Sequence, residues 1–257
     1  MDATADLTVI KLGGTTISEQ RDTLAEVAAL SVDRQLMLVH GGGRRLTEWL
    51  ARLGLESRFA DGLRVTDDDA LEVALGVLGG LVNGELVAAL RSLGADAVGL
   101  TGIDGGLLVS RRTPGLGRVA TVSGARPTLA YALLAAQLLP VVAPLALDEE
   151  GQICNVNADD AAAGLAGALG ARLLLLTDTD GVLDAAGHSI RELDELRAEQ
   201  LITEGVIKGG MLPKVRGALA VLRSGGSEVV IADGGQTRAV TRSLTDPGFG
   251  TRIRSVA

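Results

Sequence analysis

The sequence predicts an α/β protein in which a mainly parallel central sheet lies between two layers of helices, a three-layer αβα sandwich. Short aliphatic segments that end near glycines alternate with longer segments of helical periodicity, which is the pattern of parallel strands joined by crossover helices. Several of these aliphatic segments are apolar on both faces, as expected for strands covered by helices on each side. With 257 residues, 47% of them hydrophobic, the chain can build one large core or two fused lobes.

The order of elements follows from the same patterns. The predicted strands are residues 7–12, 35–40, 97–101, 139–144, 173–177 and 228–232. The predicted helices are residues 23–32, 44–53, 67–93, 128–138, 158–169, 193–203 and 212–223.

Two segments carry unusual glycines. The helical segment 67–93 contains four of them, and each glycine in a helix interior costs up to about 1 kcal/mol relative to alanine. We therefore expect this helix to be broken, kinked or packed tightly against another helix. Residues 107–122 have Gly115 and Gly117 near their middle, which predicts a β-hairpin with a loose tip.

Composition narrows the class of protein. The formal charge is −8 and the positive residues are scattered, so nucleic acid is not an expected partner. Cys154 is the single cysteine, which excludes an internal disulfide and fits a reducing compartment. The first six residues lack the pattern of a signal peptide and no run of about 18 apolar residues occurs, so we expect a cytoplasmic protein without a membrane span.

Two glycine-rich loops follow predicted strands, Lys11-Leu12-Gly13-Gly14 and His40-Gly41-Gly42-Gly43. Glycines let backbone amides approach an anion closely, and a helix N-terminus after the second loop also favours negative charge. The spacing is neither that of a Walker P-loop nor that of G-x-G-x-x-G. Each loop alone could equally be a tight strand-to-helix turn. His40 itself is interpreted as structural.

Three polar segments lie further along the chain. Asn155, Asn157 and Asp159 alternate before an alanine-rich helix, and Asn157 alone would suffice to cap it. Pro213 suits a first helical turn, so Lys214 lies near a helix N-terminus, where an anionic ligand explains a lysine better than helix stability does. Residues 177–183 form a strand end that turns through Gly181, and this segment either lines a nucleotide or is an ordinary acidic turn.

Seven segments in this order resemble the amino acid kinase family: KLGG, HGGG, GLRVTD (62–67), GLTGIDG (99–105), NVNAD, LLLLTDTDGVL (173–183) and KGGMLPKV. Each is weak alone, but together they cover the chain from Val9 to Ile253. Within the family the chain is similar to the members that act on N-acetyl-L-glutamate. The resemblance implies ATP-dependent phosphorylation of its side-chain carboxylate, giving N-acetylglutamyl 5-phosphate for arginine biosynthesis. A carboxylate is already ionised near neutral pH, so no general base is needed.

The resemblance also implies roles for individual residues. Lys11 and Lys214 would stabilise the transferring phosphoryl group, and Asp159 would hold both lysines in place. Arg64 would bind the carboxylate that is not phosphorylated. The other residues implied in the acceptor site are Gly41, Gly42 and Asn155. Those implied in the ATP site are Gly13, Gly14, Asp178, Thr179, Asp180, Gly181, Val182, Leu183, Val206, Ile207 and Lys208.

The expected cofactor is Mg-ATP, with Mg²⁺ held mainly by the phosphates and water and no protein metal site. The family pattern places the acceptor in a lobe formed by residues 1–171 and ATP in a lobe formed by residues 172–257, within one continuous domain. The chain enters its first strand almost immediately, without the N-terminal helix that links dimers into hexamers in arginine-inhibited members. We therefore expect a homodimer with twofold symmetry that is insensitive to arginine.

Alternatives remain at this point. Arg64 could instead form a surface ion pair with Asp67 or Asp68. The basic pair Arg44-Arg45 leaves room for a more acidic acceptor, as in a kinase of carrier-protein-linked aminoadipate or glutamate. The same fold could also serve as a non-catalytic amino-acid-sensing module.

Overall fold

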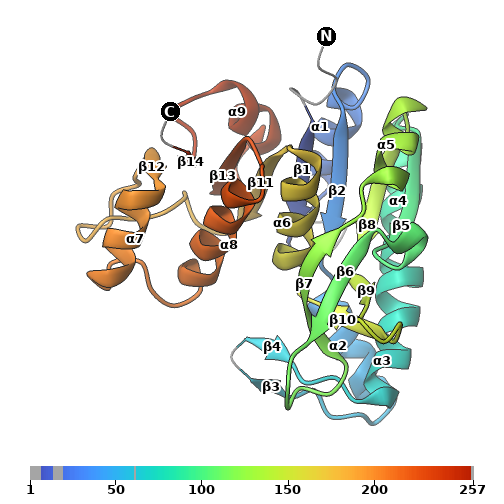
Figure 1. Cartoon of the computed structure of the whole chain (residues 1–257). Coiled ribbons are helices and arrows are strands. Elements are labelled where there is room, and N and C mark those ends of the chain that lie inside the picture. Colours follow the sequence, from blue (N-terminus) through green and yellow to red (C-terminus); the bar gives the residue numbers. More distant parts are fainter. Residues whose placement is uncertain (1–6, 14–19, 61, 256–257) are drawn as a thin grey trace.

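The computed structural model describes residues 7–13, 20–60 and 62–255. Within these ranges, an eight-stranded sheet runs through the molecule in the order β12-β14-β13-β11-β1-β2-β8-β5 (Figure 1). All neighbouring strands are parallel except β13 and β14, so the predicted mainly parallel sheet is confirmed. The strands are β1 (Thr8–Leu12), β2 (Leu36–His40), β5 (Ala97–Thr101), β8 (Leu139–Ala143), β11 (Arg172–Thr177), β12 (Glu192–Asp194), β13 (Glu228–Asp233) and β14 (Thr251–Arg254).

Helices cover both faces of this sheet. Successive side chains of a strand point to opposite sides, so each strand contributes to an apolar layer on each face. Val9 of β1 belongs to one buried apolar cluster, whereas Ile10 and Leu12 belong to another. The first cluster includes residues of α5 (Thr128–Ala135), α6 (Ala158–Leu169), α7 (Glu195–Thr203) and α8 (Met211–Arg223). The second includes residues of α1 (Arg21–Leu30), α2 (Gly43–Arg52), α3 (Asp68–Ala74), α4 (Asn83–Ser92) and α9 (Ala239–Thr245). The three layers predicted from the sequence are therefore present.

The helix expected at residues 67–93 is continuous but changes its winding. It begins as α3, capped by the Asp67 carboxylate, which accepts a hydrogen bond from the Ala70 amide at 2.9 Å. It continues as a π-helical segment, Leu75–Val82, and ends as α4. Three of its four glycines have open space around the position of a Cβ atom, whereas a Cβ on Gly79 would lie 3.3 Å from side chains of Thr101 and Leu145.

By length and composition, Asp68–Ser92 is the one helix in the described residues that could cross a membrane, with 39% of its most apolar window buried. Core helices of soluble proteins pass the same test.

A smaller β unit lies beside the sheet. It contains β6 (Leu108–Arg112), β7 (Val119–Ala125), β9 (Leu145–Leu147) and β10 (Ile153–Val156), and a two-residue pair, β3 (Phe59–Ala60) and β4 (Leu63–Arg64), lies close to its lower end (Figure 1). The predicted hairpin is confirmed as β6 and β7, but its tip is not loose. Thr66 donates its amide to Leu116 O at 3.1 Å and accepts from the Arg118 amide at 2.6 Å. Gly117 has a φ of +71°, and a Cβ there would lie 2.3 Å from Thr66 O.

A buried ion cluster joins the C-terminal strands. The Glu228 carboxylate of β13 lies 2.7 Å from Arg172 of β11 and within 3.2 Å of Arg252 and Arg254 of β14. Arg252 also donates to the Ser243 and Asp246 carbonyls at the end of α9, at 2.8 and 3.0 Å. Burial alone would raise the pKa of Glu228, but the arginine charges outweigh it and lower the pKa.

Candidate active site

The polar loops predicted from the sequence meet beyond the carboxyl ends of β1, β2 and β11, where ligands bind in open α/β sheets. At their centre Asp159, in the first turn of α6, bridges two lysines. Its Oδ1 lies 2.8 Å from Lys11 Nζ at the end of β1, and its Oδ2 lies 2.7 Å from Lys214 Nζ in the first turns of α8. The structure thus brings together the three residues assigned to catalysis.

The charges of this triad are held in a partly buried setting. The side chains of Lys11, Lys214 and Asp159 are 13%, 22% and 28% exposed. Burial opposes ionisation of Asp159, but the nearby charges and hydrogen bonds of both lysines prevail and lower its pKa. Two cations and one anion leave a net positive charge that faces the hollows on either side.

The first hollow, of about 240 Å³, lies on the side of β2 and the β3–β4 pair. It is lined by Lys11, by the glycine-rich loop after β2 and by several apolar side chains. All four residues expected to bind the acceptor, Gly41, Gly42, Arg64 and Asn155, lie on its wall. Neither Arg44 nor Arg45 does, and Arg45 instead pairs with Glu85 at 3.1 Å.

The two glycine amides of this hollow differ in availability. The Gly41 amide donates to Leu12 O at 3.2 Å, so it is already engaged. Across residues 7–13, 20–60 and 62–255, no acceptor for the Gly42 amide is present. Gly42 therefore offers a donor to a ligand in the hollow, while Gly41 joins β1 to β2.

Arg64 is anchored by neutral oxygens rather than by the acidic residues next to it. Its Nη2 donates to Gly43 O and to Thr47 Oγ1, both at 2.9 Å, and its Nη1 donates to Ser57 Oγ. The guanidinium lies over the ring of Phe59, 4.6 Å from its centroid, and burial lowers the Arg64 pKa. The two alternative partners are occupied elsewhere, because Asp67 caps α3 and Asp68 pairs with Arg118. The guanidinium thus enters the hollow without a carboxylate partner among the described residues.

Thr66 links the two sides of the acceptor hollow and was missed by sequence reasoning. Its hydroxyl donates to Arg64 O at 2.8 Å and accepts from Asn155 Nδ2 at 3.3 Å. Because the β6–β7 tip also bonds to Thr66, that hairpin supports both Arg64 and Asn155. Asn157, in contrast, acts as the cap of α6, accepting from the Asp159 amide at 2.7 Å.

The second hollow, of about 490 Å³, lies on the other side of the lysines. Its wall includes Lys11, Gly13, Asp178 and Lys214, which the sequence analysis assigned to catalysis or to ATP, whereas Gly14 lies outside the described residues. The residues on its wall that sequence reasoning missed include Gln20, Asp233, Gly234 and Gly235. Asp233 ends β13 and the two glycines follow it, in the same strand-then-glycine pattern as KLGG and HGGG, which was the available signal.

The remaining residues assigned to ATP lie after β11 and after α7. Val182 and Ile207 are buried in the core, and the Val182 amide donates to Thr251 Oγ1 at 2.8 Å. The Asp180 carboxylate accepts from Ser189 and pairs with Arg191 at 3.4 Å, and the Thr179 amide donates to Thr177 Oγ1. Gly181 has a φ of +97° and packs against Thr251. Leu183 and Lys208 are exposed, and Val206 packs against the core.

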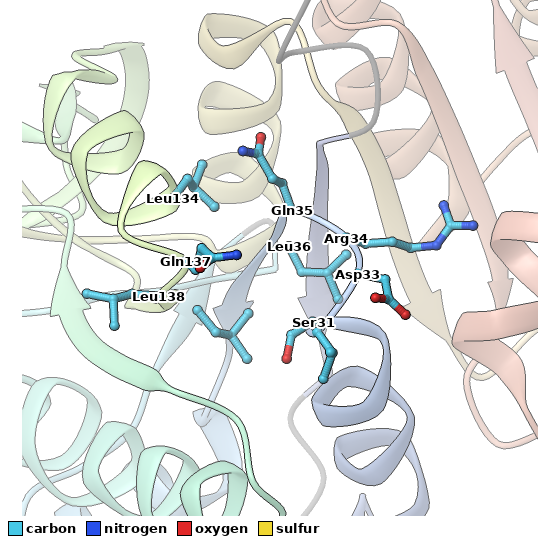
Figure 2. A pocket seen from close by; sticks show the side chains of 10 residues that line it. Ser31, Asp33, Arg34, Gln35, Leu36, Leu134, Gln137 and Leu138 are labelled. Carbon is cyan, nitrogen blue, oxygen red and sulfur yellow. The ribbon is translucent and has the colours of Figure 1, made fainter. Parts of the chain in front are cut away.

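A further hollow of about 160 Å³ lies at the opposite, amino ends of β2 and β8. Figure 2 shows Arg34, Gln35 and Gln137 around it. It is far along the strands from the lysines, so it is not part of the site described above. Within the described part of the chain, no group of three or more His, Cys, Asp or Glu side chains is arranged to hold a metal ion.

The fold and the paired lysines define an enzyme of the phosphotransferase class, in which cations and amides stabilise a moving phosphoryl group. The family model described as "Amino acid kinase family" matches residues 6–233, and the chain belongs to that family.

Two relatives named "Acetylglutamate kinase" are similar over most of their length. The protein from Solibacter usitatus (strain Ellin6076) is 43% identical, covering 95% of this chain and 98% of the relative. That from Methanopyrus kandleri is also 43% identical, covering 88% and 94%. Among solved structures, smu.665 from Streptococcus mutans UA159 has a TM-score of 0.79 at 27% identity, covering 97% of this chain and 98% of the other. The resemblance inferred from the seven segments is confirmed.

Proposed function

We propose that the protein transfers the γ-phosphoryl group of ATP to the side-chain carboxylate of N-acetyl-L-glutamate, giving N-acetylglutamyl 5-phosphate and ADP in arginine biosynthesis. The observation that carries this proposal is the Lys11–Asp159–Lys214 bridge between two hollows, one lined by Arg64 and Asn155 and the other by glycine loops. The relatives named above support the choice of acceptor. Since Arg44 and Arg45 do not line the acceptor hollow, the geometry offers no particular support for a more acidic acceptor.

In the proposed reaction a carboxylate oxygen attacks the γ-phosphorus, and the bond from this phosphorus to the β–γ bridging oxygen breaks. The departing ADP carries the electron pair, and no proton needs to be removed from the acceptor. Lys11 would neutralise the transferring oxygens from the acceptor side and Lys214 from the nucleotide side. The Gly42 amide would add a backbone donor in the acceptor hollow.

Asp159 would act as a positioning residue in this scheme. It touches both lysine ammonium groups and keeps them aimed across the boundary between the hollows. Its carboxylate remains ionised because the two lysines lower its pKa. This arrangement spares the two cations from repelling each other before anionic substrates enter.

The nucleotide hollow fits a polyphosphate, because two lysines and the glycine segments at Gly13 and Gly234–Gly235 surround it. We assign it to the ATP phosphates, with Asp178, Thr179, Asp180, Gly181, Val182, Leu183, Val206, Ile207 and Lys208 around the rest of the nucleotide. When bound, Mg²⁺ would neutralise phosphate charge, held mainly by the phosphates and water.

The proposed lobes meet inside the sheet, with residues 1–171 holding the acceptor and residues 172–257 holding ATP. We further propose a homodimer through the helix Asp68–Ser92, since this apolar helix is incompletely buried within one chain. Light scattering at micromolar concentration would show twice the mass of one chain, and a monomer would contradict the proposal. We also propose that the protein is located in the cytoplasm.

Acceptor-dependent ADP release tests the reaction, with N-acetylglutamate, glutamate and aspartate compared in parallel. The acyl phosphate product can be trapped separately by hydroxylamine as a hydroxamate, which distinguishes phosphorylation from ATP hydrolysis. We expect turnover with N-acetylglutamate and loss of the product when Mg²⁺ is chelated. The absence of acceptor-dependent ADP release with all three acceptors would refute the kinase assignment and favour a sensing module.

A further inference from the structure

His40, the last residue of β2, is buried directly behind the acceptor hollow and is 2% exposed. Its Nδ1 lies 2.6 Å from Gly41 O, and its Nε2 lies 3.1 Å from Asn83 Nδ2. A carbonyl oxygen can only accept, so Nδ1 carries the proton and Nε2 accepts from Asn83. Burial lowers the pKa of His40 to about 4, which keeps the ring neutral and in this single tautomer near neutral pH.

The hydrogen bond to Gly41 O has a geometric effect on the next amide. A trans peptide is planar, so the carbonyl oxygen of Gly41 and the N–H of Gly42 point in opposite directions. Holding the oxygen toward His40 therefore directs the Gly42 N–H away from His40. Gly42 is the loop residue whose amide has no acceptor among the described residues, and it lines the acceptor hollow.

Asn83 fixes His40 in turn. It is the first residue after the π-helical segment and is 4% exposed. Its Nδ2 also lies 2.9 Å from Val141 O of β8 and 3.3 Å from Leu100 O of β5. One side chain thus connects the helix to three neighbouring strands. The π segment packs on the same loop, because a Cβ on Gly42 would lie 2.7 Å from Leu78 Cδ2.

Gly99 makes this position of Asn83 sterically possible. A Cβ at Gly99 would lie 2.0 Å from Asn83 Oδ1, closer than any real contact. Gly99 begins the GLTGIDG segment, which has no role in the lysine bridge or in the lining of either substrate hollow. Gly99 pairs with its neighbour strand as an ordinary residue of β5. The need for a glycine there therefore comes from the space that the Asn83 side chain occupies.

We propose that His40, Asn83 and Gly99 form a positioning relay that aims the Gly42 amide at the acceptor. None of the three is a catalytic residue, since each acts through the Gly41–Gly42 peptide. The proposal rests on the assignment of the acceptor hollow above. It predicts a selective loss of acceptor binding, with the nucleotide hollow unaffected because the relay does not reach it.

Two pairs of variants test the relay. Gly99→Ala displaces Asn83, whereas Gly124→Ala is a matched control in another strand, with open space around its Cβ. His40→Leu keeps bulk but removes the donor, whereas His40→Asn retains a donor near the position of Nδ1. Kinetics give kcat and both KM values, calorimetry gives acceptor affinity without ATP, and thermal melting identifies the folded variants.

We expect Gly99→Ala and His40→Leu to weaken acceptor binding by about tenfold or more, the value of one hydrogen bond to a charged group. The KM for ATP should stay within about twofold, Gly124→Ala should match the unmodified protein, and His40→Asn should recover part of the loss. If Gly99→Ala does not fold, the comparison of His40→Leu with His40→Asn tests the relay by itself.

Folded His40→Leu with unchanged acceptor affinity, or equal losses for His40→Leu and His40→Asn, would overturn the relay while leaving the kinase assignment intact. An unmodified protein that releases no ADP with N-acetylglutamate would instead overturn the proposed function, whereas calorimetry would still show separately whether the acceptor binds and whether the His40 variants weaken that binding.

Discussion

Acidification provides a quantitative test of how His40 is held. The ordinary pKa of 6.5 falls to about 4 in the folded protein, because burial disfavours the charged ring. Between these values the unfolded chain binds a proton at His40 that the folded chain excludes. His40 therefore contributes its full stabilisation above about pH 6.5 and loses it as the pH falls toward 4. At about 1.4 kcal/mol per pKa unit, the loss amounts to about 3 kcal/mol.

The assay is urea unfolding of the unmodified protein and of His40→Asn at several pH values from 7.5 to 4. Other titrating groups act in both proteins, so they cancel in the difference between the two free energies of unfolding. We expect the unmodified protein to lose about 3 kcal/mol more than the variant across this range. His188→Asn serves as the control, because the His188 side chain is 81% exposed. Parallel pH profiles for the unmodified protein and His40→Asn would refute this account of the buried ring.

Three further predictions concern charged side chains. Lys11→Ala and Lys214→Ala should each lower kcat by roughly 10²-fold or more, since each removes a preorganised cation; an unchanged kcat in Lys214→Ala would contradict the assigned role. Arg64→Ala should act mainly on the acceptor KM, and Arg64→Lys should fail to restore it because an ammonium group cannot replace the fork that reaches Gly43 and Thr47. Glu228→Gln should reduce the free energy of unfolding, measured by urea unfolding, by about 3–5 kcal/mol, because it leaves buried arginine charge uncompensated. A loss below about 1 kcal/mol, which is typical of exposed ion pairs, would contradict the role of the cluster.

Much of the fold was predictable because its strands and helices differ in period and length. The six predicted strands are all present, and Pro213 lies in the first turn of α8 as expected. Elements of two to four residues, such as β4, β9 and β12, offer too few positions for a period to be seen. The start of α7 was predicted at residue 193, but residues 192–194 pair with β14 instead, because tertiary pairing overrides local preference.

The candidate site shows a similar division. The motifs located Lys11 at the end of β1, and Asp159 and Lys214 near the starts of α6 and α8, because strand ends and helix starts can be read from local sequence patterns. Thr66 was missed because its role depends on Asn155, 89 positions away in the sequence, and on a hairpin tip that looked loose. Asn83 was missed for the same reason, because its hydrogen-bond partners lie on three strands and appear only when the sheet is assembled.

The pairing of β1 with β11 means that the two proposed lobes, although they bind different substrates, share one sheet and fold as one unit. The proposed acceptor and nucleotide lobes meet between residues 171 and 172, yet Lys11 on one side is in register with Leu175 on the other. Cutting the chain there would bare a row of backbone donors and acceptors along β1, whose residues Val9 and Ile10 are fully buried. A fragment ending at residue 171 would therefore expose an unpaired apolar strand edge that favours aggregation. We expect neither half to be soluble when it is expressed alone.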